Sequence, residues 1–364
     1  MAKLLKERQN IVVLNLSGNN IADEGAKALS EMVSFNTELR KLDLGNNAID
    51  YDGSAALAQA LAQNSSIRAL NLGGNYLGGL GAKALAEGIR KSDACALEEL
   101  VVSGNDIGDE GAQQLFSAIR ACKSLKLKKL DLANSGITSA GIEELAEYLK
   151  ETGSLEWLSL YMNDVGNGGA DVLAEAIRRN TSLNHLDIGG NNIGLDGIGP
   201  LASALAENES IRTLEMGYNP IGKEGAGILA ERIKFDGKIS TLRLGWCKLG
   251  ADGAQAIADA LKFNEAIATL DLRGNNLGDE GASALSHSLK VVGLEGLTKL
   301  DLGYNEIKDD GAFAIAQAMK ANPDGAASSI NMSSNYLTKF GKTALEEATS
   351  LVSEVTGKEV SIQF

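Results

Sequence analysis

The chain of 364 residues is acidic, with a formal net charge of −14 at pH 7, and 44% of its residues are hydrophobic but only 4% aromatic. It lacks the strong basic patch that phosphate binding requires, which argues against nucleic acid as a partner, and no apolar run approaches the roughly 18 residues of a membrane span. Chains of this length usually form two or three globular domains, but three prolines and no low-complexity stretch give no sign of a linker. We therefore expect one continuous domain over residues 1–364.

One pattern recurs twelve times between residues 11 and 352. Its first copy, residues 14–29, reads LNLSGNNIADEGAKAL, and the asparagine at its sixth position is followed six residues later by a glycine. Successive copies of the asparagine position lie 28 or 30 residues apart, and the glycine follows in every copy. A regular period of this length indicates a solenoid, in which each unit is one strand and one helix that cannot bury its apolar face alone.

Residues 1–10 precede the first copy. Residues 2–9 (AKLLKERQ) resemble the end of a helix, because Gln9 and Asn10 match Gln63 and Asn64, which precede a later strand. We therefore interpret residues 1–10 as the remnant of a preceding repeat helix. No polar capping unit comes before the first repeat, so we expect that Met1 is an introduced start and that a targeting peptide, further repeats or another domain preceded it.

Each repeat is predicted to begin with a strand and to continue with a helix. Leu14 and Leu16 are two apart, which is the period of a strand with both leucines facing inward. Leu57 and Leu61 are four apart, as an amphipathic helix requires. We expect the recurring glycine either to let the helix lie close to the sheet or to adopt a φ that other residues resist. Carboxylates cluster just before this glycine, where they would meet the positive end of a helix.

The recurring asparagine is predicted to be structural. Where each strand ends, its backbone groups lose their sheet partners and need others, and an inward-facing amide offers two donors and an acceptor to neighbouring repeats. We call these side chains the rungs of a ladder that joins the repeats. Cysteine stands at the asparagine position in repeat nine and Ser135 in repeat five, so we predict weaker hydrogen bonds between repeats at these two rungs. The predicted ladder is Asn19, Asn47, Asn75, Asn105, Asn163, Asn191, Asn219, Cys247, Asn275, Asn305 and Asn335.

The chain ends differently from its repeats. After a helix at residues 345–352, residues 359–364 (EVSIQF) alternate in the manner of a strand. We predict that residues 353–364 form a C-terminal capping strand that pairs with repeat twelve and covers its core.

Few residues are suited to catalysis or metal binding. Three cysteines without a C-x-x-C pair favour a reducing compartment. The only histidines, His185 and His287, lie in different repeats, so neither a zinc site nor a Ser-His-Asp triad can be assembled. We expect no enzymatic activity, no metal and no cofactor. In a reducing compartment the glycosylation sequons would remain unmodified, namely those at Asn64, Asn180, Asn208 and Asn331.

Four positions in each repeat are predicted to face the concave side of a parallel sheet: the residue before the first leucine, the residue between the leucines, and the two residues before the asparagine. The third position is mostly glycine or alanine, which makes a shallow track. Large and charged side chains stand beside it in repeats six to eleven. We predict a partner-binding surface that consists of Trp157, Tyr161, Met162, His185, Asp187, Glu215, Tyr218, Arg243, Trp246, Asp271, Arg273, Asp301 and Tyr304.

The composition of this surface favours protein binding. It holds both tryptophans of the chain, and Tyr218 and Trp246 occupy the same position in adjacent repeats, with Arg273 within reach. Aromatic and arginine anchors are typical of binding hot spots, although stacked rings can also simply stiffen a sheet. Neighbouring carboxylates such as Asp271 and Asp301 repel each other, and either a partner with Lys or Arg or plain solvation would relieve that repulsion.

The repeat pattern, L-x-x-L-x-L-x-x-N/C-x-[LI]-x-x-x-G-x-x-x-L, resembles the ribonuclease-inhibitor-like class of leucine-rich repeats over essentially the whole chain. The resemblance implies an α/β solenoid (horseshoe) of about 12 repeats, with a parallel β-sheet on the concave side, α-helices on the convex side, and protein binding. Ribonuclease inhibitor itself is rich in cysteine, unlike this chain, so ribonuclease inhibition does not follow. Five segments look similar to plant and algal intracellular members, some of which are plastid-targeted: residues 157–163, 217–222, 244–247, 288–292 and 309–317. This similarity implies the cytoplasm or the plastid stroma.

Three functions remain open from the sequence. The first is a non-catalytic scaffold that recognises a partner protein through the concave face of repeats 6–11. The second is a GTPase-activating protein of the Ran type, which uses the same repeat class but carries a long acidic tail that this chain lacks. The third is the ligand-sensing part of a larger NOD-like immune receptor, whose nucleotide-binding domain would lie upstream of Met1.

Overall fold

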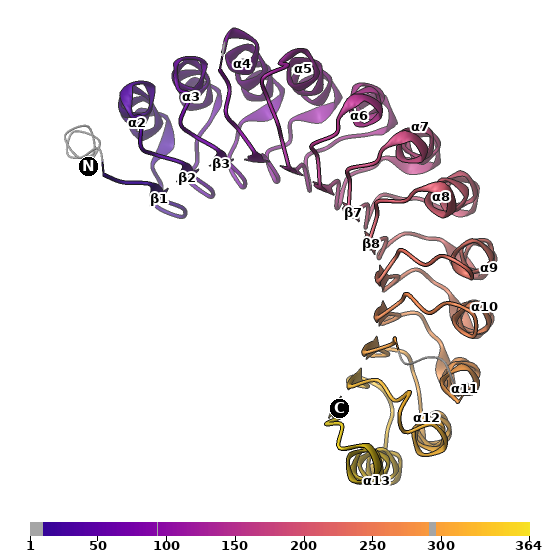
Figure 1. Ribbon diagram of the computed structural model, residues 1–364. Helices are drawn as coiled ribbons and strands as arrows, with labels where there is room; N and C mark the ends of the chain where they lie inside the picture. Colours follow the sequence, from indigo (N-terminus) through magenta and orange to yellow (C-terminus); the bar gives the residue numbers. More distant parts are fainter. Residues whose placement is uncertain (1–9, 93, 291–295) are drawn as a thin grey trace. The chain divides into compact units, whose positions relative to one another are not determined.

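The computed structural model describes residues 10–92, 94–290 and 296–364. It forms two compact units, one ending at Leu186 and one beginning at Asp187. Each unit repeats a short strand followed by a helix, and in each unit the helices lie along one side of the strands (Figure 1). The helix remnant predicted for residues 1–10 lies, except for Asn10, outside the described residues.

The first unit builds its sheet in chain order. Strands β1 to β6 pair in parallel, and their central leucines are in register, as Leu14 is with Leu42. Strand β7 (His185–Asp187) lies across the boundary between the units. The other elements are β1 (Val13–Asn15), α2 (Ala22–Phe35), β2 (Lys41–Asp43), α3 (Tyr51–Gln63), β3 (Ala69–Asn71), α4 (Gly78–Lys91), β4 (Glu99–Val101), α5 (Gly108–Ala121), β5 (Lys129–Asp131), α6 (Ser139–Glu151), β6 (Trp157–Ser159) and α7 (Gly166–Arg179).

The second unit follows the same plan. Strands β8 to β13 pair in parallel and in chain order, with β13 beside β12. These repeated elements confirm the predicted fold class, an α/β repeat solenoid with parallel strands. The elements are α8 (Leu195–Glu207), β8 (Thr213–Glu215), α9 (Gly222–Ile233), β9 (Thr241–Arg243), α10 (Gly250–Leu261), β10 (Thr269–Asp271), α11 (Gly278–Leu289), β11 (Lys299–Asp301), α12 (Asp309–Ala321), β12 (Ser329–Asn331), α13 (Lys339–Thr356) and β13 (Ser361–Gln363).

The core of each unit lies between its strands and its helices. Leu42 and Leu44 in the second repeat, and Leu57 of the helix that follows, are buried. Because side chains alternate along a strand, the residue between two inward leucines stands on the side away from the helices, which we call the open face. None of the described helices combines the length and the apolar character that a membrane crossing requires.

The recurring glycine is needed because the helix starts pack closely. Asp23 of repeat one accepts hydrogen bonds from the backbone N–H groups of Asp50 and Gly53 in repeat two, at 2.8 and 3.0 Å. A Cβ on Gly53 would lie 2.6 Å from the Asp23 carboxylate and 2.8 Å from the Ile49 side chain. Gly53 lies within a helix and has no positive φ. The expected left-handed φ therefore does not apply, and the close approach is to the start of the preceding helix and to Ile49 rather than to the sheet.

The asparagines at the strand ends join neighbouring repeats. Asn47 Oδ1 accepts from the backbone N–H groups of Asn19 and Ile21, at 2.9 and 3.2 Å, and its Nδ2 donates to the carbonyls of Leu16 and Gly45, at 2.8 and 3.1 Å. These bonds replace the sheet partners that the backbone loses where the strands end. The same two-way pattern is made by Asn75, Asn163, Asn219, Asn275, Asn305 and Asn335.

The two substituted rungs make fewer side-chain bonds. Ser135 Oγ donates to the Ala133 carbonyl of its own loop at 3.3 Å, and no bond joins this hydroxyl to the preceding repeat among the described residues. Cys247 Sγ reaches the Met216 carbonyl at 3.4 Å. Burial raises the pKa of the Cys247 thiol to about 12, so the group stays neutral and acts as a weak donor.

A second set of buried asparagines follows the helices, which the sequence analysis did not predict. Asn64 Nδ2 donates to the carbonyls of Val33 and Asn36 in the preceding repeat, at 2.7 and 2.8 Å. Asn264 makes the equivalent bonds in repeat nine. Three of the four sequon asparagines hold this position and are buried, namely Asn64, Asn180 and Asn208. Their amides are therefore part of the fold.

In repeat eight this position is Asp236, which fits poorly. Its Oδ1 accepts from the backbone N–H of Lys238 at 2.6 Å, but its Oδ2 is buried and has no hydrogen-bond partner among the described residues. An amide nitrogen there would donate to the preceding repeat, as those of Asn64 and Asn264 do. We expect Asp236→Asn to raise the free energy of unfolding by about 1 kcal/mol, measured by urea denaturation. The matched reverse change, Asn264→Asp, should lower it, and an unchanged Asp236→Asn variant would contradict this account.

Candidate functional site

One position on the open face has an unusual backbone in every repeat. It is the residue before the strand-end asparagine, and its φ lies between 48° and 72° in all twelve copies. We call these residues the left-handed row. Its members are Gly18, Asn46, Gly74, Gly104, Asn134, Met162, Gly190, Tyr218, Trp246, Gly274, Tyr304 and Ser334.

The left-handed row suits glycine, yet four of its members are large. A left-handed backbone costs a residue with a Cβ roughly 1–2 kcal/mol, a cost that glycine escapes and asparagine bears more easily. Seven of the twelve members are glycine or asparagine, the residues for which this conformation costs least. The large exceptions, Met162, Tyr218, Trp246 and Tyr304, all belong to the partner-binding surface predicted from the sequence.

Three of these exceptions form one cluster in the second unit. The Tyr218 and Trp246 rings are stacked, with centroids 6.2 Å apart and planes 11° apart. Trp246 also meets Tyr304, with centroids 5.7 Å apart and planes tilted by 45°. Tyr218, Trp246 and Tyr304 are 50%, 39% and 53% exposed. We call this cluster of three exposed rings the aromatic platform.

Gly274 makes the platform continuous. It is the row member between Trp246 and Tyr304, and a Cβ on it would lie 2.3 Å from Cδ2 of the Trp246 indole. The Trp246 indole therefore lies against the backbone of Gly274. Because Gly274 has no side chain, the indole can reach Tyr304, two repeats away. The sequence analysis did not include Gly274, although a glycine between two aromatic members of the row was the available signal.

Arg273 lies beside the platform, tied to a buried carboxylate. Its Nε and Nη2 donate to Asp271 Oδ2, at 2.9 and 2.6 Å, and its backbone N–H donates to Asp271 Oδ1 at 3.0 Å. The bond to Asp271 raises the pKa of the Arg273 guanidinium. The stem of Arg273 lies over Gly245, where a Cβ would be 3.0 Å from Arg273 Cγ. The small residue at this track position therefore makes room for the arginine.

The carboxylates between the leucines have local partners. Asp187, Asp271 and Asp301 each accept, at 3.0 Å, the backbone N–H of the residue two positions further on. Asp301 also accepts from Asn331 Nδ2 at 2.9 Å. Glu215 forms an ion pair with Arg243 at 3.4 Å. This row of acids therefore has donors within the protein itself.

The remaining predicted residues lie in the first unit. The rings of Trp157 and His185 are stacked, with centroids 5.1 Å apart and planes 21° apart. Lys129 Nζ lies 4.4 Å from the centroid of the Trp157 ring, a cation–π contact that the sequence analysis missed. Met162 is exposed and Tyr161 is half-buried. Each unit thus carries one aromatic group on its open face.

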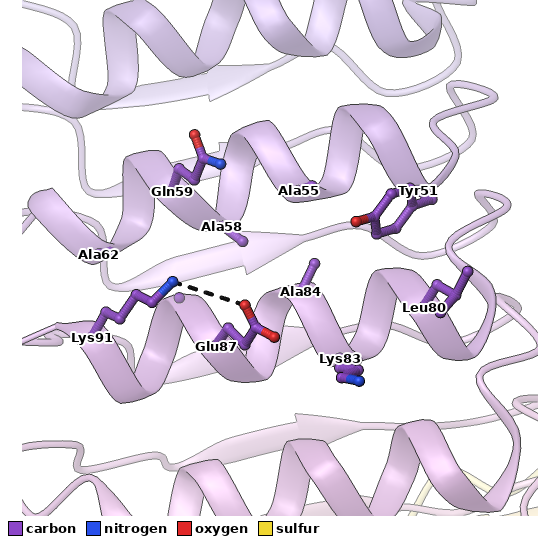
Figure 2. Close-up of a pocket in the computed structure, with 11 residues that line it drawn as sticks. Tyr51, Ala55, Ala58, Gln59, Ala62, Leu80, Lys83, Ala84, Glu87 and Lys91 are labelled. Carbon is purple, nitrogen blue, oxygen red and sulfur yellow. Dashed lines mark ion pairs between the residues drawn. The ribbon is translucent and has the colours of Figure 1, made fainter.

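The described part of the chain shows few groups of the kinds that bind metals or react covalently. It holds no cluster of three or more His, Cys, Asp or Glu that would bind a metal ion, and its three cysteines are free. A groove between α3 and α4 is floored by alanines, with Tyr51 and Leu80 toward one end and the Glu87–Lys91 ion pair (3.8 Å) nearer the other (Figure 2). These groups offer no nucleophile with an activating base.

Comparisons with known proteins concern the repeat and the fold. A family model described as "Leucine Rich repeat" matches ten segments that together cover more than half of the chain: residues 9–30, 35–58, 63–86, 95–116, 123–146, 179–202, 207–230, 238–258, 267–286 and 297–316. No curated protein matches the sequence. The strand of Trp157 and the last repeat lie outside the matched segments.

Solved structures share the fold at low sequence identity. The Rad7–Elc1 complex of yeast is 16% identical over 93% of this chain and 83% of that chain, with a TM-score of 0.56. An internalin from Listeria monocytogenes is 17% identical over 100% and 89%, with a TM-score of 0.53. The actin-binding site 2 of leiomodin-1 is 22% identical over 36% and 76%, with a TM-score of 0.33. At such identities the likeness to the Rad7–Elc1 and internalin structures concerns the fold alone.

Proposed function

Since the chain belongs to the leucine-rich repeat family, we propose that it is a non-catalytic scaffold that binds a partner protein through the open face of repeats six to eleven. The aromatic platform is the centre of this surface in the second unit. Trp157 and His185 form its patch in the first unit.

The observation that carries this proposal is the backbone of the platform. Tyr218, Trp246 and Tyr304 all have left-handed φ values, where glycine serves the fold better. Strained residues are concentrated at functional sites, because the fold bears their cost only where the side chain is useful. Exposed aromatic rings beside an arginine are also the side chains that dominate the energy of protein interfaces.

Stacking that merely stiffens the sheet accounts for the platform less well. Repeats with Gly74, Gly104 or Asn134 in the left-handed row carry the same backbone without a ring. Their strand pairs are built in the same way, and the Asn75 and Asn105 side chains that follow the two glycines bond to the preceding repeat. The rings are therefore an addition to a fold that other repeats complete without them.

We further propose that the protein is of the ribonuclease-inhibitor-like class, of plant or algal type, and that it works in a reducing compartment such as the cytoplasm or the plastid stroma. The segments that resemble such proteins support the first statement. The free thiols of Cys95, Cys122 and Cys247 support the second.

Affinity capture from lysate of the source cells tests the function. The platform variant is Tyr218→Gly/Trp246→Gly/Tyr304→Gly, in which each change restores the residue that the left-handed backbone favours. We expect wild type to retain a partner and this variant to lose it, while circular dichroism shows an intact fold.

The control removes three other exposed rings. Phe35, Phe235 and Phe263 lie at the helix ends, away from the open face, and are at least half exposed. The triple alanine variant at these positions should still retain the partner. Equal retention by wild type and the platform variant would refute binding through the platform.

A further inference from the structure

On the open face of the second unit, the backbone N–H groups at the strand ends are already hydrogen-bonded within the protein. The N–H groups of Tyr218, Trp246 and Tyr304 donate to carbonyls of the following repeats, at 2.8, 2.8 and 3.0 Å. Gly274 N–H does the same with Gly303, at 2.9 Å. A partner that lies on the platform is therefore recognised by side chains, and it does not add a strand there.

The side chains on this face offer flat rings and hydrogen-bond donors. Neither the Trp246 indole N–H nor the Tyr304 hydroxyl bonds to another described residue, and Arg243 and Arg273 bring guanidinium groups to the same face. A matching ligand presents apolar surface for the rings and carbonyl oxygens for the donors. A proline-rich segment does both, since proline lacks a backbone N–H and the polyproline II helix leaves its carbonyls free of internal hydrogen bonds.

The length of the platform suits such a segment. Polyproline II advances about 3.1 Å per residue, with three residues per turn, so the two ring-to-ring steps of 6.2 and 5.7 Å extend along about four residues, or little more than one turn. The track beside the rings must be small, because a Cβ on Gly217 would lie 2.9 Å from the Gly245 carbonyl. Beside Tyr218 this leaves a shallow floor, along which an extended chain fits better than a helix, while further along the track the stem of Arg273 lies over Gly245.

We propose that the aromatic platform binds a proline-rich segment of the partner in the polyproline II conformation. The proposal rests on the proposed function and specifies the partner's chemistry. Gly274 is then a positioning residue, because it lets the Trp246 indole lie flat and complete the platform.

Binding of fluorescein-labelled decaproline to the full chain, followed by fluorescence anisotropy, tests this proposal. A glycine-serine peptide of equal length serves as the reference. We expect saturable binding of decaproline to wild type and none of the reference peptide. Trp246→Gly and Gly274→Ala should each weaken binding at least tenfold.

Gly104→Ala is the matched control for Gly274→Ala. Both glycines have φ of +67°, so alanine strains the backbone equally, but a Cβ on Gly104 comes no closer than 3.5 Å to another atom. Gly104→Ala should bind decaproline as wild type does. Equal affinity of Gly274→Ala and wild type, or of decaproline and the reference peptide, would overturn the proposal. Platform-dependent capture of a partner without decaproline binding would overturn this inference and leave the proposed function standing.

Discussion

Replacing Asn275 with alanine is expected to lower the free energy of unfolding by about 3–5 kcal/mol, because it leaves several buried backbone groups without partners. Asn275 Oδ1 accepts from the N–H groups of Cys247 and Leu249, and its Nδ2 donates to the carbonyls of Leu244 and Leu272. Asn275 is fully buried, so water does not replace these bonds. Urea denaturation followed by circular dichroism measures the loss.

Asn19→Ala is the matched control for this change. Asn19 occupies the same position in repeat one, but it is exposed and donates only to carbonyls of its own repeat. We expect it to cost less than about 1 kcal/mol, the usual net value of a hydrogen bond that water can replace. Similar losses for Asn19→Ala and Asn275→Ala would show that the ladder does not hold the repeats together through its buried bonds.

Gly88→Ala is expected to destabilise the protein by about 2–3 kcal/mol, although alanine is normally the better helix former by about 1 kcal/mol. Gly88 lies in the C-terminal half of α4, where a Cβ would be 2.4 Å from the Ala58 carbonyl oxygen of α3 and 2.9 Å from its carbonyl carbon. Both are backbone atoms, so the two helices must separate to make room. Thermal or urea denaturation measures the effect.

Gly227→Ala isolates the helix propensity from the packing. Gly227 also lies inside a helix, α9, but a Cβ there meets nothing within 4 Å. We expect this variant to gain about 0.5–1 kcal/mol. If Gly88→Ala were stabilised to the same extent, the contact between α3 and α4 would be looser than the structure has it.

The features that recur in every repeat could be predicted from the sequence, because twelve copies of the pattern make each recurring position recognisable. The two leucines of a strand, the apolar spacing of a helix and the asparagine position define the fold without any long-range information. The second asparagine set was missed because Asn64, Asn180 and Asn208 also form sequons, and its members vary to serine, cysteine, threonine and aspartate in other repeats. The repeat pattern also did not predict that a small residue is needed at positions such as Gly88. That need depends on how closely two neighbouring helices approach each other.

On the open face the sequence predicted positions better than contacts. The neighbouring rings of Tyr218 and Trp246 follow from their equal place in adjacent repeats. The hydrogen-bond partners of the carboxylates could not be predicted from their positions in the repeat. Asp271, for example, accepts hydrogen bonds from the backbone N–H and the guanidinium group of Arg273. The left-handed φ of the row was likewise missed, although glycine and asparagine at seven of its twelve positions are a sign of it.

Repeat nine combines the thiol rung of Cys247 with the central ring of the platform, Trp246, the residue just before it. A rung with a weak donor lowers the cost of opening that repeat locally, and hydrogen exchange of its loop reports such opening. Under the proposed function, a partner on the platform would touch the repeats on both sides and would have to be released before repeat nine opens. With such a partner, binding and local unfolding would therefore compete at the same point, and the bound complex would gain rigidity at a repeat whose rung is a weak donor.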